Sequence, residues 1–329
     1  MNSKKQKINI LLLSSITAVL LAACSPQQDE VPGNATATLG VSSVQVVTGS
    51  IATRADTKPI TSGKLWVGIR ASTPAGGMGD DNVYVARRGL IYECRDSKWT
   101  CPNVVLLTPY DISLYAYYPQ DGYAISDADA ITLEPAIFSD KKDLRYARKS
   151  FNSVNINYPD AIFELIHAYA RIKLSISPST EFSGTGKITA FALKAAKNDE
   201  TIIISKPLYI NQNISSPGNP STDGYTFPVT TTVDAAHKPN TDCDVLFPPQ
   251  TLPDGGLQVS LTIDGVSRSA TIPKADFPDG ELKENNQYTV HLEIGANATI
   301  TVSGSSVTEK DWENPSSGDF GNIEDIVSF

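Results

Sequence analysis

The sequence is poor in the residues that most often bind metals or carry out acid–base chemistry near neutral pH. Among 329 residues there are only 3 histidines, 4 cysteines and 2 methionines. No His-Glu-x-x-His, Gly-x-Ser-x-Gly or Gly-x-x-x-x-Gly-Lys-Ser/Thr motif occurs. These absences predict no metal, no cofactor and no enzymatic activity. A hydrolase whose site is assembled from scattered carboxylates is an alternative that no spacing excludes.

An excess of positive charge is also missing. Lysine and arginine number 27 against 36 aspartates and glutamates, which gives a formal net charge of −9. A surface of this sign is repelled by phosphate backbones, so nucleic acid is not expected as a partner. With 40% hydrophobic residues and with 21 prolines and 22 glycines, the composition is typical of a folded, turn-rich protein.

The few candidate ligands do not form a site in the sequence. His167, His237 and His291 are far apart and have no acidic partner pattern. His167 lies in an apolar run, which favours a hydrogen-bonded imidazole in the core over a metal ligand. The acidic clusters at 127–129 and 140–143 lack the glycine and the terminal glutamate of a calcium loop, and we expect them to be solvated loop charges.

The N-terminus has the features of an export signal. Lys4, Lys5 and Lys7 precede a short apolar run over residues 8–21, which ends in Leu21-Ala22-Ala23-Cys24. Small residues before a cysteine are typical of a bacterial lipobox, so residues 1–23 are predicted to be a signal peptide. We expect the thiol of Cys24 to receive diacylglycerol and the new amino group an acyl chain such as palmitate. The alternative is an ordinary cleavage site that happens to precede a cysteine.

The remaining cysteines bear on oxidation after export. Cys94 and Cys101 lie on either side of a polar stretch that reads as a hairpin turn, and an exported protein folds in an oxidising compartment. A disulfide between them is therefore predicted, with two unpaired thiols as the alternative. Cys243 is expected to be a lone residue on or near a strand.

From residue 38 onward the pattern is that of β-strands. Residues 38–48 are rich in β-branched side chains, and later strand-length runs recur between glycine and proline turns. Leu257, Val259, Leu261 and Ile263 share one face of such a run. The segment Asp160 to Tyr169 could be helical. Many short strands at this spacing predict an all-β protein made of β-sandwiches, with a domain boundary near residue 180.

Several segments together resemble the fimbrillin family of pilus subunits and related lipoproteins. The matching segments occur in the family's order along nearly the whole chain: Thr53-Arg54-Ala55, Leu114-Tyr115-Ala116-Tyr117-Tyr118-Pro119, Lys142-Asp143-Leu144-Arg145-Tyr146-Ala147, Phe163 to Ile172, Phe247-Pro248-Pro249-Gln250-Thr251-Leu252, Asn286-Gln287-Tyr288-Thr289-Val290 and Val307-Thr308-Glu309-Lys310-Asp311-Trp312.

The resemblance implies two transthyretin-like β-sandwich domains in tandem, at residues 55–180 and 181–329. It implies that residues 24–54 form a lipidated tether and a removable strand, and that a trypsin-like protease cuts between Arg54 and Ala55. The side chains that would leave with the expelled strand are Leu39, Val41, Val44, Val46 and Val47. The donor strand would come from the tail after Trp312, through Ile323, Ile326, Val327 and Phe329.

The implied function is that of a structural subunit of a cell-surface pilus that is assembled by donor-strand exchange and supports adhesion. Its implied partners are other pilus subunits, the outer membrane through the lipid of the precursor, and a receptor on a host or bacterial surface. An exposed loop position for Arg54 and a tail that pairs within its own subunit are the alternatives at those sites. A monomeric surface lipoprotein, either a pilus anchor or tip or a glycan-binding module with Trp66, Trp99 or Trp312 as platforms, is the alternative function.

Overall fold

The computed structural model describes residues 36–48, 56–71, 84, 86–126, 129–212, 216–233 and 243–312. Within these ranges the chain is all-β, which confirms the predicted fold class. The described helices are four single 3₁₀ turns: η1 (Gln120–Gly122), η3 (Lys274–Asp276), η4 (Pro278–Gly280) and η5 (Ala296–Ala298). In this part of the chain no helix is long and apolar enough to cross a membrane.

The N-terminal half of the described chain forms one eight-stranded sheet with the order β2-β1-β10-β9-β6-β3-β4-β5. Its strands are β1 (Gly40–Thr48), β2 (Asp56–Pro59), β3 (Gly63–Ile69), β4 (Arg87–Arg95), β5 (Lys98–Thr100), β6 (Leu114–Tyr118), β9 (Arg145–Ala147) and β10 (Asp160–His167). The sheet curls, because Thr38 before β1 forms a bridge with Leu106, which follows β5. The curled sheet encloses a first core that draws its buried residues from positions 39–165.

Strand β10 decides an alternative that the sequence left open, since the segment that could be helical is a strand. Ala161, Phe163 and Leu165 are fully buried, whereas the residues between them are partly exposed. This alternation with a period of two matches a strand with one face toward a core and does not match a helix.

The C-terminal half of the described chain, together with β7 and β8 from the N-terminal half, forms four further sheets. Their orders are β22-β21-β11-β16-β8, β15-β12-β18-β19, β14-β13-β7 and β17-β20. The strands are β7 (Ala130–Leu133), β8 (Ala136–Ile137), β11 (Ala170–Pro178), β12 (Lys187–Ala195), β13 (Ile202–Tyr209), β14 (Asn219–Ser221), β15 (Tyr225–Thr232), β16 (Asp244–Phe247), β17 (Gln250–Thr251), β18 (Leu257–Ile263), β19 (Val266–Ile272), β20 (Glu281–Leu282), β21 (Asn286–Ile294) and β22 (Ile300–Asp311).

The five-stranded and four-stranded sheets bury a second core, whose residues run from Ala170 to Ile300. Along β18 the four side chains Leu257, Val259, Leu261 and Ile263 are all buried, and the residues between them are partly exposed. The predicted inward face of this strand is therefore confirmed.

A third buried cluster joins residues from both halves of the sequence. β7 and β8 lie in the chain between β6 and β9, but they pair with β13 and β16. On the outer side of the first sheet, Trp66 stacks on Tyr117 at 5.3 Å between ring centroids. The same cluster contains Leu208, Leu246 and Trp312. The aromatic residues of the first sheet are thus covered by residues of the second half.

Candidate functional site: the first strand and its groove

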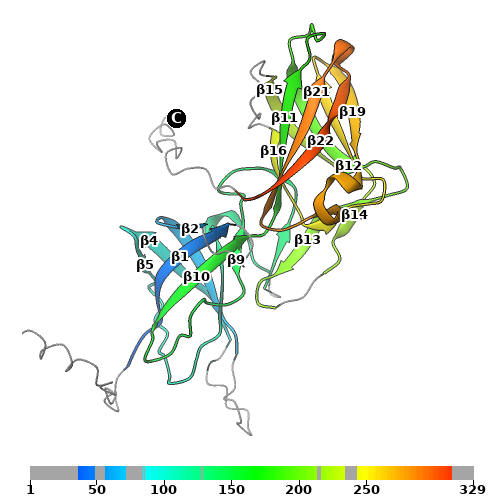
Figure 1. Ribbon diagram of the computed structural model, residues 1–329. Coiled ribbons are helices and arrows are strands. Elements are labelled where there is room, and N and C mark those ends of the chain that lie inside the picture. Colours follow the sequence, from blue (N-terminus) through cyan, green and yellow to red (C-terminus); the bar gives the residue numbers. More distant parts are fainter. Residues whose placement is uncertain are drawn as a thin grey trace, which may run out of the picture. The chain divides into compact units, whose positions relative to one another are not determined.

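The candidate site is strand β1 together with the strands that hold it. β1 pairs with β10 on one side in parallel and with β2 on the other side in antiparallel orientation. β1 and β10 run side by side in the same direction in Figure 1, β1 in blue and β10 in green. Before β1, the amide of Leu39 donates to the carbonyl of Val105, and the amide of Leu107 donates to the carbonyl of Ala37. The strand therefore fills a gap between β10 and the segment after β5.

Leu39, just before β1, and Val41 and Val44 of β1 belong to the first core. Val41, Val44 and Val46 lie opposite Ala161, Phe163 and Leu165 of β10. The relative exposures of the five predicted strand residues Leu39, Val41, Val44, Val46 and Val47 are 7%, 6%, 1%, 3% and 5%. Burial of an aliphatic side chain of this size stabilises a fold by about 1.5–3 kcal/mol, so the five together contribute about 8–15 kcal/mol. Removing β1 would expose a long apolar groove.

A bulge sets the spacing of these inward residues. The register with β10 shifts between Val41 and Ser43, so that two inward valines, Val41 and Val44, stand three positions apart instead of two. On the outer face, the side-chain amide of Gln45 donates to Glu164 at 3.2 Å. Val47 faces the same outer side and lines a pocket of about 390 Å³ with Tyr146 and Phe151.

Strand β2 depends on β1 for its place in the sheet. Among the described residues, β2 is at the sheet's edge and has β1 as its one ladder partner. Seven residues, 49–55, connect the two strands. The predicted cleavage residues Arg54 and Ala55 lie there, outside the described residues, as do Cys24 and the tail residues Ile323, Ile326, Val327 and Phe329.

A buried ion network lies where the described chain ends. Trp312 is 1% exposed, and its ring stacks on the imidazole of His167 at 4.0 Å between centroids and 8° between planes. The His167 Nδ1–H donates to Asp143 Oδ1 at 2.7 Å, and Arg145 donates to Asp143 Oδ2 at 2.6 Å. This arrangement fixes the residue from which the predicted donor tail departs.

A second ion pair borders the same tryptophan. Arg171 Nε donates to Asp244 Oδ1 at 2.8 Å. The Arg171 guanidinium lies over the ring of Phe138 at 3.6 Å from its centroid and at 5.6 Å from that of Trp312. Trp312 is thus enclosed by one imidazole, one guanidinium and one phenyl ring from three segments of the chain.

The charges of the network follow from its geometry. Burial by itself would raise the pKa of Asp143, but the hydrogen bond from His167 Nδ1–H and the guanidinium of Arg145 outweigh it and hold that pKa below its ordinary value. Burial lowers the pKa of His167 below its ordinary value, and Asp143 offsets this only in part. His167 is therefore neutral at pH 7, with its Nε2 atom buried and without a hydrogen-bond partner among the described residues.

These contacts confirm one prediction and correct two. His167 is a hydrogen-bonded core imidazole, as its apolar surroundings indicated. Asp143 was expected to be a solvated loop charge, but it is fully buried because it holds both His167 and Arg145. Asp129 was expected to be solvated too, but it is 7% exposed and accepts hydrogen bonds from Tyr115 and Asn211. No local signal in the sequence distinguishes such carboxylates, because their partners are distant.

The cysteines Cys94 and Cys101 are thiols in the structure. The β4–β5 register places Cys94 opposite Trp99, so Cys101 lies on the same face but diagonally across the hairpin. Diagonal pairs stand farther apart than a disulfide spans, so bond formation would need a shift of the hairpin. A bond between the two remains a prediction.

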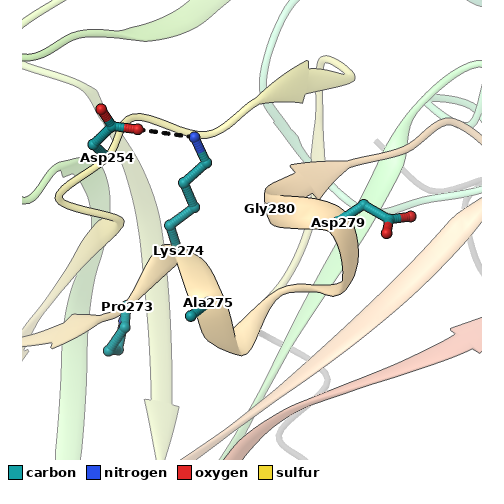
Figure 2. Close-up of a pocket in the computed structure, with 6 residues that line it drawn as sticks. All are labelled: Asp254, Pro273, Lys274, Ala275, Asp279 and Gly280. Atoms are coloured by element: carbon teal, nitrogen blue, oxygen red, sulfur yellow. Dashed lines mark hydrogen bonds and ion pairs between the residues drawn. The ribbon is translucent and has the colours of Figure 1, made fainter.

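The surface also holds a shallow pocket of about 470 Å³ beside η3 and η4. In Figure 2, Lys274 reaches across to Asp254, while Asp279 points away from that pair. The Lys274–Asp254 distance is 3.0 Å, and Asp279 is bonded to Lys283. The charged side chains that line this pocket are thus already in ion pairs. Within the described ranges, no group of three or more His, Cys, Asp or Glu is arranged to hold a metal ion.

The fold and the site define an all-β protein in which an N-terminal strand completes the first sheet. The chain belongs to the fimbrillin-like family, because the model of that family matches residues 53–312. The resemblance seen in the sequence is thereby confirmed. The match begins one residue before Arg54 and ends at Trp312, so β1 lies ahead of it.

Two solved structures have a similar fold. A candidate cell-adhesion protein from Bacteroides uniformis matches with a TM-score of 0.57 and 15% identity, over 85% of this chain and 100% of that one. A candidate cell-adhesion protein from Bacteroides ovatus matches with a TM-score of 0.56 and 12% identity, over 83% and 98%. No curated protein matches the sequence.

Proposed function

We propose that this protein is a structural, non-catalytic subunit of a cell-surface pilus and supports adhesion. In this proposal the chain is exported as a lipoprotein precursor anchored in the outer membrane through Cys24, and it becomes part of a fimbria after processing. Membership of the fimbrillin-like family supports the pilus assignment. The observation that carries the mechanism is strand β1, which is buried in the first core yet is joined to the rest of the chain by a short connection that contains Arg54.

We propose that a protease cuts between Arg54 and Ala55 and that β1 then leaves the sheet. The backbone of β10 would lose its ladder partner, and the inward residues Ala161, Phe163 and Leu165 would face water. A strand from another subunit restores both the hydrogen bonds and the apolar contacts, so strand addition is strongly favoured. The tail with Ile323, Ile326, Val327 and Phe329 is the proposed donor.

We propose two tandem sandwich domains as the frame for this exchange. The proposed domains are residues 55–180 and 181–329. The first core ends at Leu165 and the second begins at Ala170, so the two cores meet a little before this proposed boundary. The segment with β7 and β8 belongs to the first half of the sequence but pairs with the second.

The alternative of a glycan-binding module has little support from the tryptophans. Trp66, Trp99 and Trp312 are 4%, 8% and 1% exposed, so none of them offers a stacking platform to a sugar. A receptor on another cell would have to be bound elsewhere on the surface.

The experiment that tests the proposal treats purified precursor with a limiting amount of an arginine-specific protease. We expect a new terminus at Ala55 and a ladder of SDS-resistant oligomers. Arg54→Ala should block both, whereas Arg95→Ala, which removes an exposed arginine of the β4–β5 hairpin, should block neither. A protein that is cut after Arg54 but stays monomeric would contradict the mechanism.

A further inference from the structure

Four large apolar side chains are exposed at the end of the first sheet where β1 and β10 begin. Val104, Leu106, Tyr110 and Tyr158 are 62%, 61%, 55% and 66% exposed, and we call them the apolar end. Single exposed apolar residues are common on protein surfaces, but a group of them marks an interaction site. In the other described regions the exposed large apolar residues are Ile137, Phe151 and Val266.

Hydrogen bonds hold the segments of the apolar end to the start of β1. Thr38 forms a bridge with Leu106, and the amide of Gly40 donates to the carbonyl of Pro159, next to Tyr158. The apolar end has two sides: Val104, Leu106 and Tyr110 lie after β5, and Tyr158 lies before β10. Both sides flank the same strand, since β1 lies between β10 and the segment after β5.

A second set of bonds joins the two sides to each other. The amide of Ile156 donates to the carbonyl of Thr108 at 2.9 Å. The hydroxyl of Tyr84 accepts from the amide of Thr108 at 2.8 Å and donates to the carbonyl of Tyr110 at 3.2 Å. The exposure of the apolar end is therefore built into the fold.

The length of the tether indicates what covers this end. The proposed lipid is on Cys24, and the described chain begins at residue 36, which leaves eleven residues between them. A chain of this length spans at most about 40 Å. Strand β1 then runs about 30 Å away from this end over its nine residues. The start of β1 is thus the point at which the tether enters the first sheet, within about 40 Å of the proposed lipid.

We infer that the apolar end of the precursor docks on the lipid surface to which Cys24 anchors it. Tyrosine has an apolar ring and a polar hydroxyl, and it favours the headgroup level of a bilayer, where both are satisfied. Leu106 and Val104 add apolar area beside the two tyrosines. The inference rests on the proposed lipoprotein precursor. It also predicts how the protein is released from the lipid surface: cleavage after Arg54 would remove the tether, and the docking would be lost with it.

The test places a fluorescent reporter in the apolar end of the full lipidated precursor. Tyr158→Trp is reconstituted in phosphatidylcholine vesicles whose acyl chains carry bromine, which quenches tryptophan at close range. Val266→Trp is the matched control, because Val266 is a 41% exposed residue at the start of β19, a strand outside the first sheet. The native tryptophans are buried, so the unsubstituted protein gives the background.

We expect several-fold stronger quenching for Tyr158→Trp than for Val266→Trp. Equal quenching of the two variants, in protein that carries the lipid mass on Cys24 and floats with the vesicles, would overturn the docking and leave the lipoprotein proposal intact. Absence of the lipid mass would overturn both. If Tyr158→Ser instead reduces the oligomer ladder of protease-treated protein while quenching stays equal, the apolar end contacts a second subunit and the inference is wrong.

A second variant checks the apolar contribution without a reporter. Leu106→Ser removes an exposed side chain, so the fold should be retained. We expect the lipidated variant to transfer between vesicles several-fold faster than the unsubstituted protein, whereas Val266→Ser should transfer at the unsubstituted rate. Transfer of Leu106→Ser at the unsubstituted rate would contradict the docking.

Discussion

Strand β1 should open independently of the rest of the first sheet, and Val44→Ala should increase that opening. Val44 is 1% exposed and lies opposite Phe163 of β10. The substitution removes two buried carbon groups worth about 0.8 kcal/mol each and leaves a cavity, so we expect a loss of about 1.5–3 kcal/mol. The open state does not share this loss, because Val44 is already in water once β1 has left. The substitution therefore reduces the free-energy difference between the closed and the open state by the full amount.

The assay is native-state hydrogen exchange of the β10 amides. The amide of Ile162 donates to Asn152 on the side away from β1, so the alternation of a strand directs the amides of Ala161, Phe163 and Leu165 toward β1. A loss of about 2 kcal/mol raises the population of the open state by roughly 30-fold. We expect exchange at these three amides to accelerate by about that factor, with much smaller changes in β3 and β4.

The control is Ser43→Ala, which alters a partly exposed neighbour on the same strand and should leave exchange close to the unsubstituted rate. A uniform acceleration over the whole first sheet in Val44→Ala would show that β1 leaves only when the entire sheet unfolds. That result would refute a separately releasable strand.

Three further predictions concern the buried network and the packing around it. Because burial lowers the pKa of His167, the unfolded chain takes up a proton that the folded chain does not, so stability should fall by up to about 1.4 kcal/mol per pH unit below about pH 6.5. Urea unfolding from pH 7 to 5 measures this dependence of the free energy of unfolding on pH. It should disappear in His167→Gln and remain in His291→Gln, which changes a partly exposed histidine. An unchanged pH dependence in His167→Gln would contradict its assignment to His167. Trp312→Ala should cost about 3–5 kcal/mol in urea unfolding, with Trp312→Phe losing less, and equal stability of the two would count against the stacking on His167. Gly68→Ala should cost about 1–3 kcal/mol, because a Cβ there would lie 2.3 Å from the ring of Tyr115; a thermal midpoint equal to that of the unsubstituted protein would be inconsistent with this contact.

The sequence predicted the all-β class because alternation is a local property. The inward face of Leu257–Ile263 could be read directly, and the apolar run around His167 indicated a core imidazole. The same local rule was ambiguous for β10, since a short apolar run fits a buried helix as well as a strand. Its pairing with β1 on one side and β9 on the other is what makes this segment a strand.

The parts that could not be predicted depend on residues far apart in the chain. Asp143 is buried because its partner His167, 24 positions later, returns to it across the sheet. Asp129 meets Asn211 across 82 positions, and β1 lies beside β10 across about 120. A strongly charged loop and a buried carboxylate have the same local composition, so they differ only in tertiary partners.

The central claim, that β1 is removed and replaced, is tested most directly on protein taken from its native surface. N-terminal sequencing and intact mass would be measured together with the size distribution in SDS without boiling. We predict a terminus at Ala55 in protein that runs as a ladder of oligomers. A terminus at a lipidated Cys24, in protein that runs only as a monomer, would contradict the claim and point to an anchored surface lipoprotein that retains its first strand.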